Sequence, residues 1–215
     1  MSLRALSFIA CMATLVHAHP GSHDASPQQG STSTANPTAV LGPKERAARL
    51  YFSDQRLMTQ HGKEVALFSE VLKGRVVLVN SIFTQCRDSC SLQSLKLSHV
   101  QTLLGQSMGK DVHFVSISVD PERDTPEVLN RYARHFNAGA GWTFLTGKKE
   151  SIDKVLRKFD QLAHAPEVHS TLFILGNVNT GHWIKLHPDS APDEIAGHLR
   201  QLALETAVGS NPASH

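Results

Sequence analysis

The chain has little net charge, few cysteines and no apolar run long enough to cross a bilayer. Its formal net charge is only +2 over 215 residues, which gives no electrostatic reason to expect a nucleic-acid partner. The mean hydropathy of -0.19 argues against a polytopic membrane protein. Apolar residues still make up 40% of the chain, which suffices for a packed core. The length predicts one domain with extensions.

The first 18 residues have the pattern of a secretory signal peptide. Residues 1–4 form a short basic start, residues 5–16 an apolar stretch, and Val16-His17-Ala18 a cleavage site. The apolar stretch is too short to span a bilayer, which needs about 20 residues. Cys11 lies in a stretch that faintly resembles a lipoprotein box, so lipidation there is a lesser alternative. We therefore expect an exported protein, in a compartment where disulfides persist.

Residues 19–42 are rich in Ser, Thr, Pro and Gly and carry one formal charge, Asp24. Such a segment cannot bury enough apolar surface to offset its ordering entropy, so it predicts a flexible tether. His19 and His23 could bind metal weakly there, although a solvated tail is the simpler interpretation. The predicted domain covers residues 43–206, and residues 207–215 are expected to form a disordered tail.

Strand-like and helix-like patterns alternate through the predicted domain. A small hairpin is expected over residues 57–65, turning at His61-Gly62, and the apolar run over residues 76–83 predicts a strand buried on both faces. A helix should follow and end at Gly105, because five residues keep helical spacing: Leu92, Leu95, Val100, Leu103 and Leu104. The later pattern predicts a strand over 112–119 and then a helix that is capped by Thr125 and has Pro126 in its first position. A second helix is expected over 152–159. A hairpin of 171–175 with 183–186 and a final helix from Pro192 complete the domain.

After the hairpin, the expected order is strand, helix, strand, helix, helix, strand, hairpin return and helix. This order predicts an α/β fold with a central mixed sheet flanked by helices, and with an N-terminal β-hairpin extension. It is the plan of a thioredoxin-like domain. The active turn of such a domain follows the first central strand, where Cys86 and Cys90 fall.

Cys86 and Cys90 are the two cysteines of the predicted mature chain, and both lie in one strand-to-helix turn. The N-terminus of a helix carries partial positive charge, which favours thiolate over thiol. A thiolate is both the nucleophile of disulfide exchange and a ligand of soft metals. The pattern alone therefore leaves three interpretations open: a redox pair, a metal site and a structural disulfide.

Three elements together resemble the Sco/SenC family of copper proteins. They are Cys86-x3-Cys90, the acidic loop of residues 120–127 and the triplet His169-Ser170-Thr171. The resemblance covers roughly residues 50–205; its most specific stretch is 116–127, and residues 142–147 support it. It implies a thioredoxin-like protein, either periplasmic or membrane-tethered, that binds one copper ion, as Cu(I) or Cu(II), through Cys86, Cys90 and His169.

The family assignment also implies a role and a partner. The protein would be a metallochaperone that delivers copper to the copper-A site of cytochrome c oxidase, or keeps the cysteines of that site reduced. Its partner would be the copper-A-bearing oxidase subunit or another exported copper or thiol protein. No nucleic acid is expected, the location would be periplasmic with a possible association with the inner membrane, and no catalytic residue is implied.

The chemistry of the three side chains agrees with this resemblance. Two thiolates and an imidazole suit Cu(I), and they hold Cu(II) if water or a carboxylate completes a tetragonal set. A spacing of four places Cys86 and Cys90 on one face of a helical first turn; a disulfide between them is still reachable if the turn is irregular.

Two departures from the family pattern distinguish this chain. Arg87 and Ser91 stand where the family commonly has prolines, and Val168 stands where it commonly has aspartate, with Glu167 one residue earlier. Proline fixes φ, so its absence should loosen the turn. The cation of Arg87 favours thiolate and disfavours a nearby metal ion.

The principal alternative is a metal-free periplasmic thiol-disulfide reductase with Cys86 and Cys90 as its catalytic residues. A peroxidase is a weaker third interpretation, because the typical peroxidatic turn is missing. The loop of residues 120–127 is expected to be a structural loop and helix cap, with contact between Asp120 and the copper pocket as a lesser alternative. Six histidines are expected not to be ligands: His61, His99, His113, His164, His182 and His187.

Overall fold

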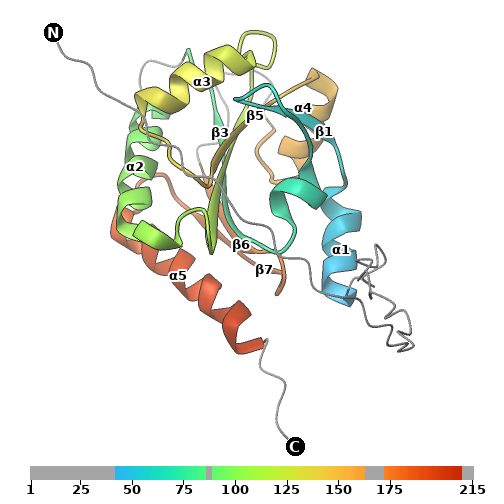
Figure 1. The fold of residues 1–215 in the computed structure, drawn as a ribbon, viewed down its shortest axis with the longest axis vertical. Coiled ribbons are helices and arrows are strands. Elements are labelled where there is room, and N and C mark those ends of the chain that lie inside the picture. Colours follow the sequence, from blue (N-terminus) through green and yellow to red (C-terminus); the bar gives the residue numbers. More distant parts are fainter. Residues whose placement is uncertain (1–41, 86–88, 163–171, 210–215) are drawn as a thin grey trace, which may run out of the picture. The chain divides into compact units, whose positions relative to one another are not determined.

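The computed structural model describes residues 42–85, 89–162 and 172–209 (Figure 1). The helices are α1 (Pro43–Phe52), the π-helical turn η1 (Leu67–Leu72), α2 (Ser89–Leu104), the 3-10 turn η2 (Gly105–Ser107), α3 (Pro126–His135), α4 (Lys149–Lys158) and α5 (Pro192–Gly209). The strands are β1 (Arg56–Thr59), β2 (Glu64–Ala66), β3 (Val76–Ile82), β4 (Val112–Ser118), β5 (Trp142–Thr146), β6 (Phe173–Asn177) and β7 (His182–Leu186).

One mixed sheet joins all the described strands in the order β2-β1-β5-β4-β3-β6-β7. Strands β3 and β5 both run parallel to β4, whereas β6 runs antiparallel to β3 and β7 to β6. At the other end, β1 runs antiparallel to β5, so the predicted hairpin continues the main sheet. This arrangement confirms the predicted α/β class, the mixed sheet and the N-terminal hairpin.

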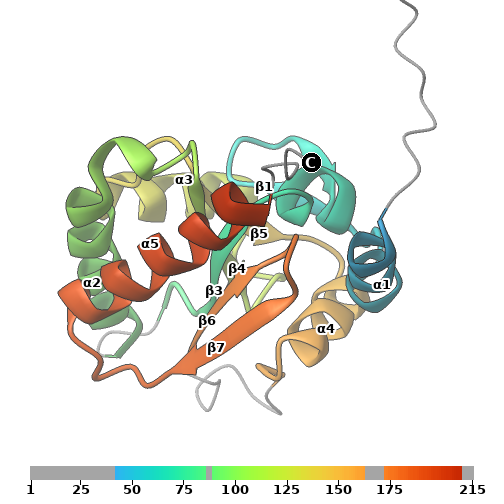
Figure 2. The same ribbon diagram turned by 90° about the horizontal axis from the view of Figure 1, so that it is seen from below.

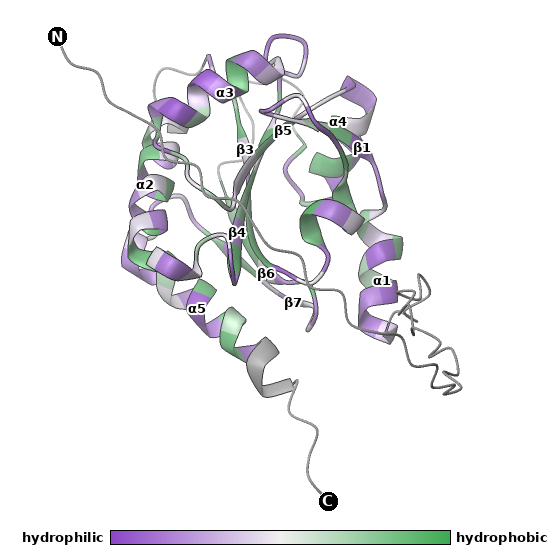
Figure 3. Ribbon diagram, in the orientation of Figure 1, coloured by the Kyte–Doolittle hydropathy of each residue, from purple (hydrophilic) through white to green (hydrophobic). Residues whose placement is uncertain are grey.

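Helices cover both faces of the sheet (Figure 2). Side chains alternate along a strand, so Val76 and Leu78 of β3 join the core under α2, α3 and α5, whereas Val77 and Val79 join the core under α1, η1 and α4. Apolar residues accordingly line the sheet and the inward helix faces (Figure 3). No helix in the described ranges is both long and apolar enough to cross a bilayer.

Four described elements were not predicted: β5, α1, η1 and η2. Strand β5 is only five residues long, and without its neighbours Trp142 to Thr146 does not differ from a short apolar loop. Helix α1 buries only Phe52 among its residues. Because the rest of this segment is rich in charged residues, the sequence shows no apolar face that would predict a packed helix. At the other end, α5 continues to Gly209, three residues beyond the predicted domain end at 206, because its leucine, alanine and glutamate residues favour helix.

Helix α2 ends before Gly105 as predicted, but its buried face differs from the apolar spacing in the sequence. Leu92, Leu95 and Leu103 are exposed, whereas Leu97 and Val100 are fully buried. The buried face also includes Gln93 and Ser94, and the hydroxyl of Ser94 lies 2.8 Å from that of Tyr132. A hydrogen-bonded polar side chain can be buried at small cost, so hydrophobicity alone does not identify the packed face here.

Several predicted features lie outside the described residues. They are the signal peptide with Cys11, residues 19–41 of the tether with His19 and His23, and residues 210–215 of the predicted tail.

Candidate functional site

The predicted cysteine turn joins β3 to α2. Strand β3 ends at Ile82 and α2 begins at Ser89, so the backbone of Cys90 lies in the first helical turn. The N–H groups of that turn point away from the helix, where they stabilise negative charge. Cys86 and His169 lie outside the described residues, as do His164, Glu167 and Val168, so the Cys86, Cys90 and His169 ligand set remains a prediction.

The segment that contains His169 enters the sheet directly beside β3. Strand β6 begins at Phe173 and runs antiparallel to β3, with Val79 opposite Ile174. The start of β6 is therefore next to the end of β3, from which the cysteine turn leaves. The side chain of Gln161 donates a hydrogen bond of 2.8 Å to the Leu172 carbonyl. This bond joins described residues on the two sides of the His169 segment.

Asp124 is the described side chain that connects the acidic loop to the cysteine turn. Its carboxylate is fully buried and accepts hydrogen bonds from the Thr84 hydroxyl and, at 2.6 Å, from the Ser118 hydroxyl. Burial raises the pKa of the Asp124 carboxyl, and the bonds from Ser118 and Thr84 oppose that rise. Since Thr84 lies two residues before Cys86, Asp124 fixes the beginning of the turn to the end of β4.

Asp120 is held within its own loop. Its side chain pairs with Arg123 at 3.0 Å, and its backbone carbonyl accepts the N–H of Asp124 at 2.9 Å. Thr125 caps α3 through the N–H of Val128, which confirms the predicted cap. Contact between Asp120 and the copper pocket stays a prediction, because Cys86 and His169 lie outside the described residues. The hydrogen bond to Thr84 belongs to Asp124. Both carboxylates are buried, and no sequence pattern shows which of them accepts the hydrogen bond from Thr84.

The described histidines have separate surroundings. The Nδ1 atom of His182 lies 2.7 Å from Glu205, that of His187 lies 3.2 Å from Asp189, and that of His61 lies 3.2 Å from the amide of Asn130. Within the described part of the chain, no group of three or more His, Cys, Asp or Glu side chains could hold a metal ion.

His113 should make the stability of the fold depend on pH. It is partly buried in β4, and burial together with the charge of Arg75 lowers the pKa of its imidazole from 6.5 to about 4. As the pH falls from 6.5 to 4, the unfolded chain gains a proton there that the folded chain does not. We expect the free energy of unfolding to fall by about 2 kcal/mol over this window from His113 alone.

Urea unfolding at pH 7, 5 and 4 checks this expectation. In His113→Gln, whose side chain cannot titrate, the free energy of unfolding should depend less steeply on pH than in the wild type. Titration of the carboxylates affects the stability of both proteins alike. Identical slopes for the two proteins would contradict the role of His113.

A model of the SCO1/SenC family matches residues 43–204. The chain belongs to the SCO1/SenC family. The SCO1 protein homolog of Bacillus subtilis (strain 168) is 36% identical over 124 residues, a match that covers 54% of this chain and 63% of that relative. The match thus spans less than two thirds of that relative's length.

Solved structures of this SCO1/SenC chain's relatives share its fold. Bradyrhizobium japonicum ScoI with copper bound has a TM-score of 0.58 and 28% identity, and the match covers 68% of this chain and 96% of that one. BsSco, described with a disulfide switch as a member of the Sco family of cytochrome c oxidase assembly proteins, has a TM-score of 0.59 and 28% identity, with 69% and 91% of the two chains covered. The predicted family is confirmed.

Proposed function

We propose that this SCO1/SenC protein is an exported, periplasmic copper metallochaperone. It takes up one copper ion as cargo through Cys86, Cys90 and His169, and it serves the copper-A site of cytochrome c oxidase. There it delivers copper or keeps the cysteine thiols of the copper-A site reduced, and its partner is the oxidase subunit that carries this site. The observation that carries the proposal is the copper-bound state of the Bradyrhizobium relative, a member of the family to which this chain belongs.

The arrangement of the strands supports this donor set. The cysteine turn leaves the end of β3, and the segment with His169 enters the neighbouring strand β6. Two thiolates and an imidazole form a ligand set suited to Cu(I). The first turn of α2 favours the thiolate form of a cysteine located there. These residues therefore meet the main chemical needs of a soft-metal carrier.

Asp124 supports the site from behind the turn. The Thr84 hydroxyl is hydrogen-bonded to the buried Asp124 carboxylate, so the chain enters the cysteine turn in a defined position. This holds even though Arg87 and Ser91 replace the family's prolines. A ligand whose supporting residues are held by hydrogen bonds keeps its geometry when the metal leaves. This support suits a protein that must accept and release copper.

A second candidate function is metal-free thiol-disulfide exchange by Cys86 and Cys90. The disulfide switch described for BsSco favours it, and so does Arg87, whose charge would favour a reactive thiolate and oppose a nearby metal ion. In that case the protein would be an enzyme with the same two cysteines as its catalytic residues.

Copper titration of the reduced chain tests the proposal. Without oxygen, the protein should take up one equivalent of Cu(I) in competition with a chromogenic chelator, because the predicted mature chain has one thiolate pair. One equivalent of Cu(II) should give a thiolate-to-copper charge-transfer absorption. If the reduced protein leaves all copper to the chelator yet reduces a disulfide substrate, the reductase function replaces the copper function.

A further inference from the structure

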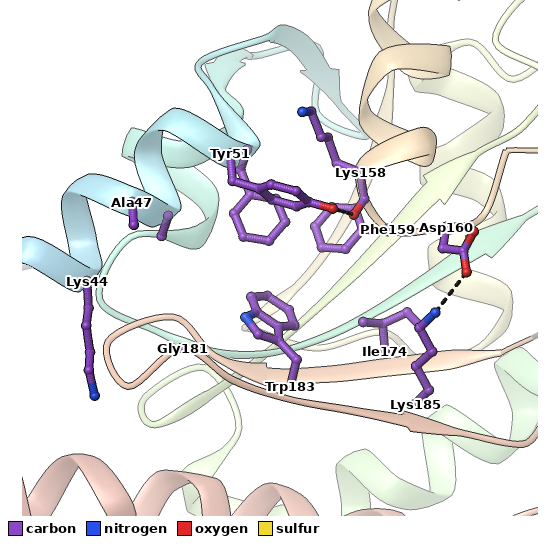
Figure 4. A pocket seen from close by; sticks show the side chains of 12 residues that line it. Lys44, Ala47, Tyr51, Lys158, Phe159, Asp160, Ile174, Gly181, Trp183 and Lys185 are labelled. Atoms are coloured by element: carbon purple, nitrogen blue, oxygen red, sulfur yellow. Dashed lines mark hydrogen bonds and ion pairs between the residues drawn. The ribbon is translucent and has the colours of Figure 1, made fainter.

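A cavity of about 540 Å³ lies between α1, the end of α4 and the hairpin of β6 and β7. It is on the face of the sheet covered by α1 and α4, whereas the helix that follows the cysteine turn, α2, packs on the other face. Its volume is in the range of small-molecule sites, which is about 300–1,000 Å³. Figure 4 shows that its walls combine aromatic rings with lysine side chains.

Aromatic rings form the wall of this cavity. Phe52 stacks on Phe159 with their centroids 5.0 Å apart, and Phe52 also lies 5.2 Å from the ring of Trp183. The Tyr51 hydroxyl donates a hydrogen bond of 2.9 Å to the carbonyl of Lys158, which ties α1 to the end of α4. The wall is therefore held in place before any ligand arrives, so little ordering free energy opposes binding.

Gly176 provides the seat for Trp183. The two residues face each other across β6 and β7, and a Cβ atom on Gly176 would lie 2.1 Å from Cε3 of Trp183. With any other residue at 176, the indole could not rest against the backbone of β6. Gly176 thus leaves room for the Trp183 ring, which forms part of the cavity wall (Figure 4).

The rim of the cavity is positively charged. Lys44, Lys158 and Lys185 contribute three cations, and Asp160 contributes one carboxylate that pairs with Lys185 at 2.8 Å. The Lys158 ammonium lies 4.7 Å from the centre of the Tyr51 ring. Among the residues that the structure describes, neither Lys44 nor Lys158 has a carboxylate within ion-pairing distance. An apolar wall with two uncompensated cations at its edge complements a molecule with an apolar body and a negative head.

We propose that this cavity binds an anionic amphiphile as a free monomer, such as a single-chain carboxylate. Its chain packs against Phe52, Phe159 and Trp183, and its carboxylate lies at the lysine rim. This is a second binding function, and it does not depend on copper or on the cysteine pair.

Titration of the full chain with dodecanoate below its micellar concentration tests the proposal. The structure describes two tryptophans, of which Trp142 is buried and Trp183 lines the cavity, so binding should shift the emission of Trp183 to shorter wavelength with single-site saturation. Trp183→Phe should remove that shift while calorimetry still detects binding. Dodecyltrimethylammonium, which has a chain of similar length and the opposite charge, should bind at least tenfold more weakly.

Surface variants separate the site from unspecific adsorption. Lys44→Gln/Lys158→Gln should weaken dodecanoate binding at least tenfold and leave dodecanol binding unchanged, whereas Lys110→Gln, remote from the cavity, should change neither. Gly176→Ala should weaken both ligands, because the methyl group displaces Trp183; thermal unfolding shows whether that variant is folded.

Three results with the soluble ligands overturn the proposal. They are no saturable binding of dodecanoate, equal affinity for the anionic and cationic chains, and unchanged affinity in the double lysine variant. Binding to phosphatidylglycerol vesicles without binding of monomeric dodecanoate would also overturn it. That result would indicate that this face of the protein binds a membrane surface.

Discussion

Replacing Cys86 and Cys90 together by serine should lower the affinity for Cu(I) by about a thousandfold or more, because soft Cu(I) prefers thiolate and a serine hydroxyl stays protonated at neutral pH. The remaining imidazole of His169 cannot by itself compete with a strong chelator. Competition titration under reducing, oxygen-free conditions measures the loss directly. The charge-transfer absorption of the Cu(II) form should disappear in the same variant.

Two controls make this result specific. The reduced, copper-free double variant should unfold at the temperature of the reduced wild type, which shows that the fold has not been lost. His169→Ala should keep more affinity for Cu(I) than for Cu(II), because two thiolates still hold the softer ion, and it should leave disulfide exchange largely intact. If copper binding survives the double cysteine change undiminished, copper binds at other residues. The first candidates would then be His19 and His23 of the predicted tether.

Leu97→Ala should destabilise the fold by about 3 kcal/mol, within the usual range for a buried leucine. The side chain of Leu97 is fully buried in the core between α2, the sheet and α5, so its truncation leaves a cavity there. Urea unfolding of the reduced protein measures the difference in the free energy of unfolding.

Leu95→Ala is the matched control in the same helix. Leu95 is 60% exposed, so its replacement should change stability by less than about 0.5 kcal/mol. The two variants carry the same chemical change two positions apart, and helix propensity affects them equally. If Leu95→Ala cost more than Leu97→Ala, the packed face of α2 described above would be wrong.

Local signals predicted most of the elements. The apolar run over residues 76–83 corresponds to β3, the turn at His61-Gly62 to the hairpin of β1 and β2, and the Thr125-Pro126 pair to the start of α3. Each of these signals acts between residues close in the chain, through side-chain burial, turn geometry or capping. The family, too, was apparent from the cysteine pair, the acidic loop and the His169 triplet.

By itself, then, the sequence determined the class of fold, the order of most elements and the side chains that make copper chemistry plausible, because short-range periodicity and side-chain chemistry carry that information. Only the tertiary structure decided which face of α2 is buried, which carboxylate of the acidic loop reaches Thr84 and that β5 lies next to β4. It also created the aromatic cavity from residues as far apart as Lys44 and Lys185. The physical reason is that burial and pairing depend on which distant segments meet, and a local pattern does not contain that information.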